Sequence, residues 1–401
     1  MMYKVVTIGL GYIGLPTSVL IASNGIEVFG VDTNQKILNK LKKGQAHIAE
    51  PGLNSELKKV IKNNNLKVGK TPVEGNVYLI VVPTPFKDNH HPDISYIEDA
   101  ALSVIPLLKF DDLFIIESTS PIGTTEKIRD LIYSKRPELK NKINIAYCPE
   151  RVLPGNILYE LIHNDRVIGG INNESSNRAV KFYSTFVLGK LTTTDSKTAE
   201  MCKLTENSSR DVQIAFANEL SMICDKADIN VRELIKLANL HPRVNILNPG
   251  CGVGGHCIAV DPYFITSKYP IESKLIRTGR EINNYKAIWC IEKIIEKYKE
   301  FEKINKKSPS IAILGLTFKP NVDDIRESPA LYIAKKVKEI IPNKNLFFVD
   351  PNIKSEKDLK ISGLKETIKI SDIVVLLVAH KEFAKTNLSD RIVMDFCGIK
   401  Q

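Results

Sequence analysis

The sequence predicts an α/β protein with two Rossmann-like, doubly wound parallel-sheet domains joined by a central helical domain with a long connecting helix. Short apolar, β-branched runs alternate with helical patterns over residues 3–170 and again over 310–398. Between these regions, residues 195–301 show apolar side chains at helical spacing and no strand pattern. Because strands that alternate with helices form parallel sheets, each outer region predicts a separate α/β domain.

The first region begins with a βαβ unit. Residues 3–8 (YKVVTI) form a short apolar run, a glycine turn and a helical stretch over 12–24 follow, and EVFGVD (27–32) forms the next strand. We place the first domain at residues 1–194. Further strands are predicted at 77–85, 112–119, 143–149 and 166–170.

The middle region, residues 195–302, reads as helical. Residues 196–229 predict one long helix, and more helix is expected at 231–239 and 274–301, with a glycine-rich loop between them. KINKKSPS reads as a linker, and the last domain is predicted over 303–401. Its strands are expected at 310–318, 345–351, 371–380 and 391–398.

The composition restricts the class of protein. The chain has 401 residues, is 43% hydrophobic and 25% charged, and carries a formal net charge of +10, which suits an anionic ligand or a solvated lysine surface. No nucleic-acid motif and no bilayer-length apolar run are evident, so neither nucleic acid nor a membrane is expected as a partner. The seven cysteines include no C-x-x-C pair, and the first residues run directly into a strand pattern. We therefore expect reduced thiols in a cytoplasmic protein.

A dinucleotide-binding fingerprint follows the first strand. Gly9, Gly11 and Gly14 form G-x-G-x-x-G, with Leu10 and the pair Tyr12-Ile13 between them, and the next strand ends at Asp32. The first glycine allows the turn, the second lets a pyrophosphate approach the backbone, and the third lets helix and strand pack closely. A carboxylate at Asp32 would bind the ribose hydroxyls and repel a 2′-phosphate. The pattern therefore predicts NAD rather than NADP.

Two threonines follow later strands of the same sheet. Thr84 lies in VVPTP and Thr119 in ESTSPIGTT. Because ligands bind at the carboxyl ends of parallel strands, both threonines are placed to contact the cofactor or a catalytic water. The alternative is that each only caps the helix that follows it.

A polar stripe interrupts the long apolar helix. Lys203, Asn207 and Arg210 are spaced i, i+4 and i+7, which places them on one face. The face is either solvent-exposed or the wall of a polar site, and the spacing alone favours the first.

The loop NPGCGVGGHCIAVDPYF (248–264) holds four glycines, two cysteines and a histidine. A metal site is not expected, because Cys251, His256 and Cys257 are too crowded and no second pair of ligands follows. Two interpretations stay open for Cys257: an inert, buried thiol, or a nucleophile whose pKa is lowered by a nearby cation such as Lys203.

Seven motifs occur in order along nearly the whole chain: GLGYIGLP, STSPIGTT, CPERVLPG, KLTENSSRDVQIAFANE, HPRVN, GVGGHCIAVDPYF and LGLTFKPNVDDIRESPA. The set resembles the UDP-glucose/GDP-mannose dehydrogenase family. These enzymes oxidise the C6 primary alcohol of a nucleotide sugar to a carboxylate with two NAD+ and no metal. The resemblance implies an N-terminal NAD domain, a central helical domain that forms a homodimer, and a C-terminal domain that binds the UDP-sugar.

The resemblance also implies catalytic roles. Cys257 would trap the aldehyde as a thiohemiacetal, and a second hydride transfer would give a thioester that water hydrolyses. Lys203 and Asn207 would stabilise the developing oxyanion.

Other family positions are matched as well. Asp261 would place water or accept a proton, Glu150 would provide base chemistry in hydrolysis, and Thr119 would hold the catalytic water or the nicotinamide end. Lys319 would face the substrate, and Arg326 the NAD pyrophosphate.

Two departures from the commonest family pattern are informative. PERVLPG carries Pro154 where many members have a second acid, and the usual lysine before Asp261 is absent. Both are similar to the branch that oxidises UDP-N-acetyl-D-mannosamine to its uronate. The expected substrate contacts, besides Lys203, Asn207 and Lys319, are Arg151, Val152, Arg210, His241, Arg243 and Gly252, with Arg243 contributed across the dimer interface.

Other functions remain to be separated from this one. The same chemistry could act on UDP-N-acetylglucosamine, UDP-glucose or GDP-mannose. A two-electron sugar or hydroxyacid dehydrogenase would share the first fingerprint but would not need Cys257. A non-catalytic nucleotide-sugar sensor is disfavoured, because Lys203, Asn207, Cys257 and Asp261 are all present.

Overall fold

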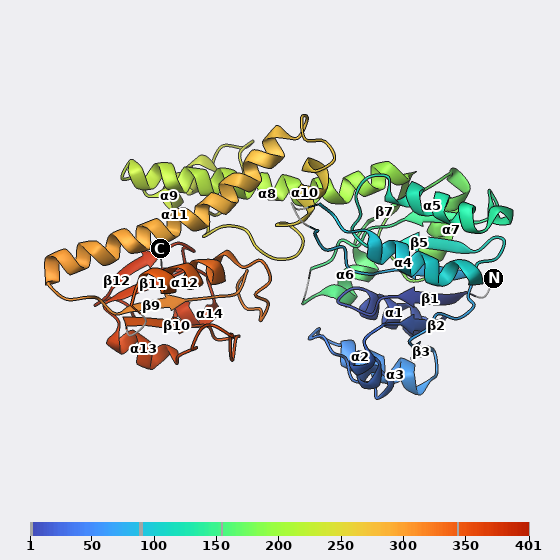
Figure 1. Cartoon of the computed structure of the whole chain (residues 1–401), viewed down its shortest axis with the longest axis horizontal. Coiled ribbons are helices and arrows are strands. Elements are labelled where there is room, and N and C mark those ends of the chain that lie inside the picture. The colour runs from blue at the N-terminus through green and yellow to red at the C-terminus, as the bar shows by residue number, and fades with distance from the viewer. Residues whose placement is uncertain (1–2, 88–90, 154, 343–344, 401) are drawn as a thin grey trace. The chain divides into compact units, whose positions relative to one another are not determined.

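The computed structural model describes residues 3–87, 91–153, 155–342 and 345–400 (Figure 1). The chain divides into two compact units, residues 1–205 (the first unit) and 206–401 (the second unit). Among the described residues, the first unit contains an eight-stranded sheet and the second a four-stranded sheet. Helix α8 (Ser196–Lys226) passes through the division between the units.

The sheet of the first unit has the strand order β3-β2-β1-β4-β5-β6-β7-β8. All neighbouring strands are parallel except β6 and β7, so the sheet is mixed rather than wholly parallel as predicted. The strands are β1 (Lys4–Ile8), β2 (Glu27–Val31), β3 (Leu66–Gly69), β4 (Val77–Ile80), β5 (Leu113–Ile116), β6 (Asn144–Tyr147), β7 (Arg166–Gly170) and β8 (Leu191–Asp195).

Successive strand residues point to opposite faces of this sheet, and each face has its own hydrophobic core. Val5 packs into one core and Val6 into the other. Helices α1 (Gly14–Ser23), α2 (Gln35–Lys42), α3 (Leu53–Lys62), α6 (Ile157–His163) and α7 (Asn173–Tyr183) contribute to the first core, and α4 (Ser95–Val104) and α5 (Thr124–Lys135) to the second. Two strands, β3 and β8, were not predicted from the sequence.

The second unit is built on a parallel sheet of order β10-β9-β11-β12. Two long helices, α8 and α11, lie before this sheet in the chain, and α11 packs against α12. The remaining elements are α9 (Val231–Ala238), α10 (Asp261–Thr266), α11 (Lys274–Asn305), β9 (Ile311–Leu314), α12 (Pro329–Ile340), β10 (Leu346–Val349), α13 (Leu364–Ile370), β11 (Ile373–Leu376), α14 (Lys381–Ala384) and β12 (Ile392–Asp395).

The two sheets share one local motif. In the first, the Gly9 N–H donates to the Val31 carbonyl at 2.8 Å, and the Leu10 N–H donates to Asp32 at 3.1 Å. In the second, Gly315 donates to the Val349 carbonyl at 2.8 Å, and the Leu316 N–H donates to Asp350 at 2.7 Å. Each motif connects the carboxyl ends of two neighbouring strands, where ligands bind in such sheets.

None of the helices within the described residues is both long and apolar enough to cross a bilayer.

Candidate active site

The first glycine loop is shaped by close contacts between backbone atoms. Gly9 has a φ of +98°, and a Cβ there would collide with the Val81 carbonyl. A Cβ on Gly14 would collide with the Gly9 carbonyl, whereas a Cβ on Gly11 would meet no atom within 4 Å. Two of the three glycines are therefore needed for packing, and the third leaves open space beside the start of α1.

Asp32 holds the glycine loop in place. One carboxylate oxygen accepts the Leu10 N–H at 3.1 Å, and the other accepts the Asn34 N–H at 2.8 Å. The side chain is only partly buried, so its charge lies at the edge of the loop and can still meet a ligand hydroxyl.

Neither threonine caps a helix of the described residues. The residue before α4 is Ile94 and the residue before α5 is Gly123, so the capping interpretation of Thr84 and Thr119 is wrong. Both threonines are partly buried. Ser118, next to Thr119, connects the two loops, because it accepts the Val82 N–H at 2.9 Å and donates to the Val82 carbonyl at 2.8 Å. Thr84 and Thr119 thus follow adjacent parallel strands whose ends are hydrogen-bonded together.

Glu150 and Lys203 lie together in the first unit. The Lys203 ammonium, which is buried, donates to the main-chain carbonyl of Glu150 at 2.7 Å. The Val152 N–H donates to the Glu150 carboxylate. Burial raises the pKa of Glu150 above its usual range, although Lys203 and the Val152 N–H act in the opposite direction. A carboxyl group with a raised pKa suits proton transfer near neutral pH.

The segment after Glu150 is held by main-chain contacts. The Arg151 guanidinium donates to the Asp165 carbonyl at 3.1 Å, and Asn164 donates to the Arg151 carbonyl at 3.1 Å. Val152 packs against the core that contains α1. Pro154, which distinguishes this segment from the commonest family pattern, lies outside the described residues.

The glycine-rich loop (248–264) and Asn207 lie in the second unit. The Asn207 amide donates to the Asp261 carboxylate at 2.5 Å, and Asp261 is buried at the first position of α10. The Cys257 carbonyl accepts the N–H groups of Val260 at 3.0 Å and Asp261 at 2.8 Å. Cys257 itself is partly exposed. Hydrogen bonds therefore connect the Cys257 backbone to Asp261, and Asp261 to Asn207 of α8.

The glycines of this loop pack against another part of the same unit. A Cβ on Gly254 would collide with the Glu327 carbonyl, and a Cβ on Gly255 would lie 2.8 Å from the Phe318 ring. The Gly255 N–H donates to the Arg326 carbonyl at 3.0 Å. The structure therefore explains these two glycines by close approach to residues 318–327.

Lys319 and Arg326 belong to that neighbouring segment. Lys319 is partly buried, with its ammonium 5.7 Å from the centroid of the Phe318 ring. Arg326 is exposed and pairs with Asp324 at 2.6 Å. Burial opposes ionisation of Asp324, but the hydrogen bonds from Arg326 outweigh it and lower the pKa of Asp324. Gly252, with a φ of +130°, lies close to Pro329 just beyond this segment.

Three expected substrate residues lie on exposed surface. Arg210 is exposed on α8, and the buried residue of that turn is Asp211. His241 and Arg243 are exposed in the loop after α9, where the Arg243 N–H donates to the His241 ring at 3.3 Å. Within the described residues, the Asn207 amide donates to Asp261 rather than to any of these three side chains.

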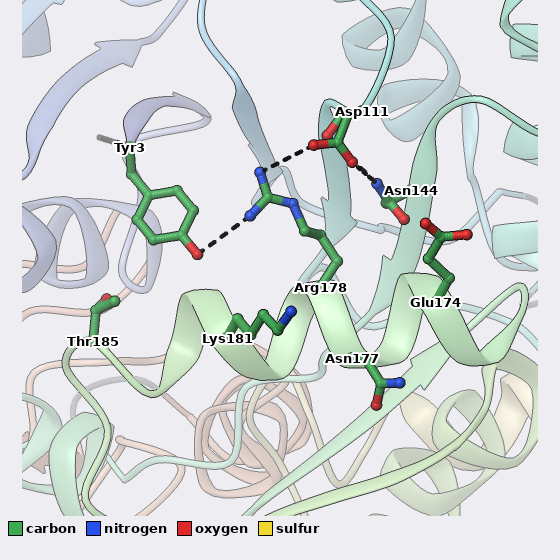
Figure 2. Close-up of a pocket in the computed structure, with 8 residues that line it drawn as sticks. All are labelled: Tyr3, Asp111, Asn144, Glu174, Asn177, Arg178, Lys181 and Thr185. Atoms are coloured by element: carbon green, nitrogen blue, oxygen red, sulfur yellow. Dashed lines mark hydrogen bonds and ion pairs between the residues drawn. The ribbon is translucent and has the colours of Figure 1, made fainter. Parts of the chain in front are cut away.

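A separate polar cavity of about 760 Å³ lies in the first unit (Figure 2). Arg178 of α7 points between Tyr3, at 3.5 Å from the hydroxyl, and Asp111, at 3.8 Å from the carboxylate. Tyr3, Asp111 and Asn144 lie at the amino ends of β1, β5 and β6. The cavity is therefore at the edge of the sheet opposite to the glycine loop.

Comparison with known proteins then identifies the family. The sequence profiles of three domains of the UDP-glucose/GDP-mannose dehydrogenase family match the chain: the NAD binding domain over residues 3–187, the central domain over 197–285 and the UDP binding domain over 312–401.

The chain belongs to this family.

It is an NAD-dependent nucleotide-sugar dehydrogenase with a UDP-sugar substrate. The UDP-N-acetyl-D-mannosamine dehydrogenase of Campylobacter jejuni is 48% identical over 98% of this chain and 99% of its own. An NDP-N-acetyl-D-galactosaminuronic acid dehydrogenase of Ralstonia nicotianae is 46% identical over 98% and 95%. The structure of the UDP-N-acetyl-mannosamine dehydrogenase of Staphylococcus aureus superposes with a TM-score of 0.88 at 40% identity, covering 99% of this chain and 95% of the other.

The first glycine loop of the dehydrogenase fits NAD. The open space at Gly11 lies where a diphosphate would approach, and no side chain caps the N-terminus of α1. The positive end of the dipole of that helix favours an anion. Asp32, partly buried beside this loop, carries a carboxylate, which is the group that binds ribose hydroxyls in such folds.

Sequence reasoning missed a group of buried polar side chains between α8 and α11. Asp211, Asn218, Arg280 and Asn283 are each no more than 2% exposed. One signal was available for Asp211, because it follows Asn207 by four residues and continues the stripe of Lys203 and Asn207 along α8. The two residues on α11 carry no such signal, since their partners lie about seventy positions away in sequence.

Proposed function

We propose that the dehydrogenase oxidises the C6 hydroxymethyl group of UDP-N-acetyl-D-mannosamine to a carboxylate. The observation that carries this proposal is the 48% identity, over nearly both full lengths, to a relative of that name. The PERVLPG and GGHCIAVDP segments support the same branch of the family. NAD accepts a hydride in each of two oxidations.

The chain's own residues would act in sequence on the sugar. The first hydride leaves C6 as the hydroxyl proton passes to a base, which gives an aldehyde. The Cys257 thiolate adds to the aldehyde carbon, and loss of the second hydride turns the thiohemiacetal into a thioester. Water then attacks the thioester and releases the carboxylate and the thiol, so the cysteine is regenerated.

The side chains around these steps have suitable chemistry. Lys203 and Asn207 supply hydrogen-bond donors for the oxyanion that forms at C6. Asp261 accepts a hydrogen bond from Asn207 and would orient that amide. Glu150, whose pKa is raised by burial, is our candidate base for the hydrolytic water. Thr119 would be the second residue that contacts this water.

Further substrate and cofactor contacts are proposed at family positions. Arg151, Val152, Arg210, His241, Arg243, Gly252 and Lys319 would contact the UDP-sugar, and Thr84 and Arg326 would contact NAD. The Arg151 guanidinium already donates to the Asp165 carbonyl, and the Arg326 guanidinium is paired with Asp324. In the proposed role, each guanidinium either binds the ligand in addition to this partner or exchanges the partner for the ligand.

We further propose three functional domains, 1–194, 195–302 and 303–401, and a homodimer formed through the central one. An apolar groove of about 530 Å³ runs along α8 and α11 and includes Met222, Ile223, Tyr285 and Trp289. Ile223 is 57% exposed in the single chain, and burial of such a surface favours association. The exposed Arg243 loop is consistent with a residue supplied to a partner's site. We expect the enzyme to work in the cytoplasm.

The identity of the sugar is tested by comparing substrates. We expect kcat/KM to be at least tenfold higher for UDP-N-acetylmannosamine than for UDP-N-acetylglucosamine, UDP-N-acetylgalactosamine, UDP-glucose or GDP-mannose, since sites that bind a substrate hydroxyl or amide discriminate against analogues. NADH formation measured at equal subsaturating concentrations gives the ratio directly. A higher value for another sugar would keep the chemistry and discard the proposed substrate.

A further inference from the structure

A chain of buried hydrogen bonds in the second unit connects α8 and α11 to the loop that carries Cys257. Asp211 and Asn218 come from α8, and Arg280 and Asn283 come from α11. Asp211 and Asn218 are fully buried, and Arg280 and Asn283 are at most 2% exposed. Buried polar groups of this kind impose one arrangement, because each lost partner would leave a desolvated charge or dipole.

One end of the chain meets the loop directly after Cys257. Nη1 of Arg280 lies 2.9 Å from the Asp211 carboxylate, and the same nitrogen donates a long hydrogen bond of 3.5 Å to the Ile258 carbonyl. The buried guanidinium therefore contacts both a helix carboxylate and the backbone of the residue next to the cysteine.

The other end of the chain meets the loop before Cys257. The Gly250 N–H donates to Asn218 at 2.9 Å, Asn218 donates to Asn283 at 2.9 Å, and Asn283 donates to the Asp211 carboxylate at 2.8 Å. A backbone N–H can only donate and an ionised carboxylate can only accept. The direction of every hydrogen bond between Gly250 and Asp211 is therefore fixed.

The backbone of α11 also contacts the loop between these two points. A Cβ on Gly252 would lie 3.0 Å from the Asn283 carbonyl oxygen. The loop is thus held at Gly250, Gly252 and Ile258, on both sides of Cys257.

We propose that Asp211, Arg280, Asn218 and Asn283 are positioning residues for the reaction, which fix the Cys257 loop so that the thiol is presented at one place. The inference rests on the proposed role of Cys257. It assigns no contact with the substrate to these four residues: they act through the loop backbone.

The same pair of helices provides a matched control. Lys293 of α11 and Asp225 of α8 form an ion pair at 2.7 Å, and their side chains are 32% and 40% exposed. Neither residue has a hydrogen bond to the loop within the described residues. Removing this pair tests whether the loss of any ion pair between α8 and α11 is enough to lower kcat.

The test uses two kinds of variant in the full-length enzyme. The double variant Asp211→Leu/Arg280→Met removes both buried charges together, which leaves no unpaired ion and protects the fold. Arg280→Lys keeps the charge beside Asp211, but a single ammonium does not reproduce the guanidinium contact with Ile258. The control is Asp225→Ala/Lys293→Ala. For each variant we would measure kcat, the KM for NAD and for the UDP-sugar, and the melting temperature.

We expect kcat to fall at least tenfold in both Arg280 variants, while the KM for NAD stays within twofold of the wild type, because the glycine loop, Asp32 and Thr84 belong to the first unit and only the proposed contact from Arg326 belongs to the second. The control should keep kcat within twofold.

A kcat within twofold of wild type in Arg280→Lys and in the folded double variant would overturn the positioning role. The positioning role would also be overturned if the control variant lost kcat as well, so that kcat fell in every variant in proportion to the decrease in melting temperature. If the double variant does not fold, Arg280→Lys decides. Wild-type turnover in Cys257→Ser would instead overturn the proposed function.

Discussion

The two cysteines of the glycine-rich loop differ in environment although they lie six residues apart. Cys257 is partly exposed, and its carbonyl lies at the start of α10. Cys251 is buried, its thiol donates to the Leu377 carbonyl at 3.5 Å, and burial raises its pKa well above the usual range. Since the thiolate is the nucleophile, only Cys257 is suited to covalent chemistry.

Replacing each cysteine separates these roles. Cys257→Ser should lower turnover at least about 100-fold, because a hydroxyl is a poorer nucleophile and leaving group than a thiolate. NAD binding, followed by titration calorimetry, should be unchanged. Cys251→Ala is the matched control and should keep turnover within twofold with a lower melting temperature. Equal losses of turnover in the two variants would contradict the assignment of the nucleophile.

Asp112 gives a prediction about pH and stability. This residue is 4% exposed, and burial raises its pKa from 3.8 to about 6, although the Lys109 N–H acts in the opposite direction. The folded state therefore binds the proton more tightly than the unfolded state, so the contribution of Asp112 to stability is lost as the pH rises from about 4 to about 6.

The Asp112→Asn variant keeps the shape of the side chain but has no carboxyl group that can ionise. Above pH 6 the variant should be more stable than the wild type by up to about 3 kcal/mol, and below pH 4 the two should be alike. Thermal unfolding from pH 4 to pH 8 measures the difference. A stability difference that does not change with pH would show that ionisation of Asp112 has no part in it.

Some site residues could be predicted from the sequence and others could not. Gly9 and Asp32 were found because their spacing from a strand is set by local geometry. On α8 the helical period suggested Arg210 as the continuation of the Lys203 stripe, whereas the buried residue is Asp211. Positions i+7 and i+8 are both close to the same face of a helix, so only the packing of α11 distinguishes them.

At the level of elements, the repeated strand–loop–strand motif has two different outcomes. Asp32 is partly exposed at the first loop, whereas Asp350 is buried and contacts the buried His380 ring at 3.2 Å. The hydrogen bonds from Leu316 at 2.7 Å and from Asn352 at 2.8 Å reproduce those that Asp32 receives. The first copy can therefore bind a ligand with its carboxylate, and the second uses its carboxylate internally.

Matched substitutions in the two copies test this difference. Asp32→Asn should raise the KM for NAD about 10- to 100-fold and weaken the discrimination against NADP, because a hydrogen bond to a charged group contributes about 1.5–3 kcal/mol. Asp350→Asn should lower the melting temperature and leave the KM for NAD within twofold. Steady-state kinetics with NAD and NADP, combined with thermal unfolding, measure both effects. The account would be wrong if Asp350→Asn raised the KM for NAD as much as Asp32→Asn.

Other elements show where sequence patterns lose information. Strand β8 was missed because it lies at the edge of its sheet and its residues are mostly exposed, so it lacks an apolar run. The central strands β1, β4 and β5 are buried on both faces and were predicted from their apolar runs. The packing of Gly254 and Gly255 against Glu327 and Phe318 is a contact between residues more than sixty positions apart, which no local pattern reveals.

For the molecule as a whole, the alternation of strands and helices predicted the α/β class, and the glycine fingerprint with Asp32 predicted NAD. The order of motifs along the chain predicted the nucleotide-sugar chemistry. The family profiles match three successive segments, and α8 passes from the first compact unit into the second. Lys203 and Asn207, one helical turn apart on α8, therefore belong to different units. Relatives at 48% and 46% identity are named for different hexosamine derivatives, so the comparison of substrates proposed above identifies the sugar.

The yield of NADH at limiting UDP-N-acetylmannosamine tests whether the enzyme carries out a four-electron oxidation through a cysteine thioester. We expect two NADH for each sugar consumed, with a product whose mass corresponds to conversion of CH2OH into COOH. One NADH for each sugar, with an aldehyde or ketone as the product, would contradict it and would place the chain among two-electron dehydrogenases.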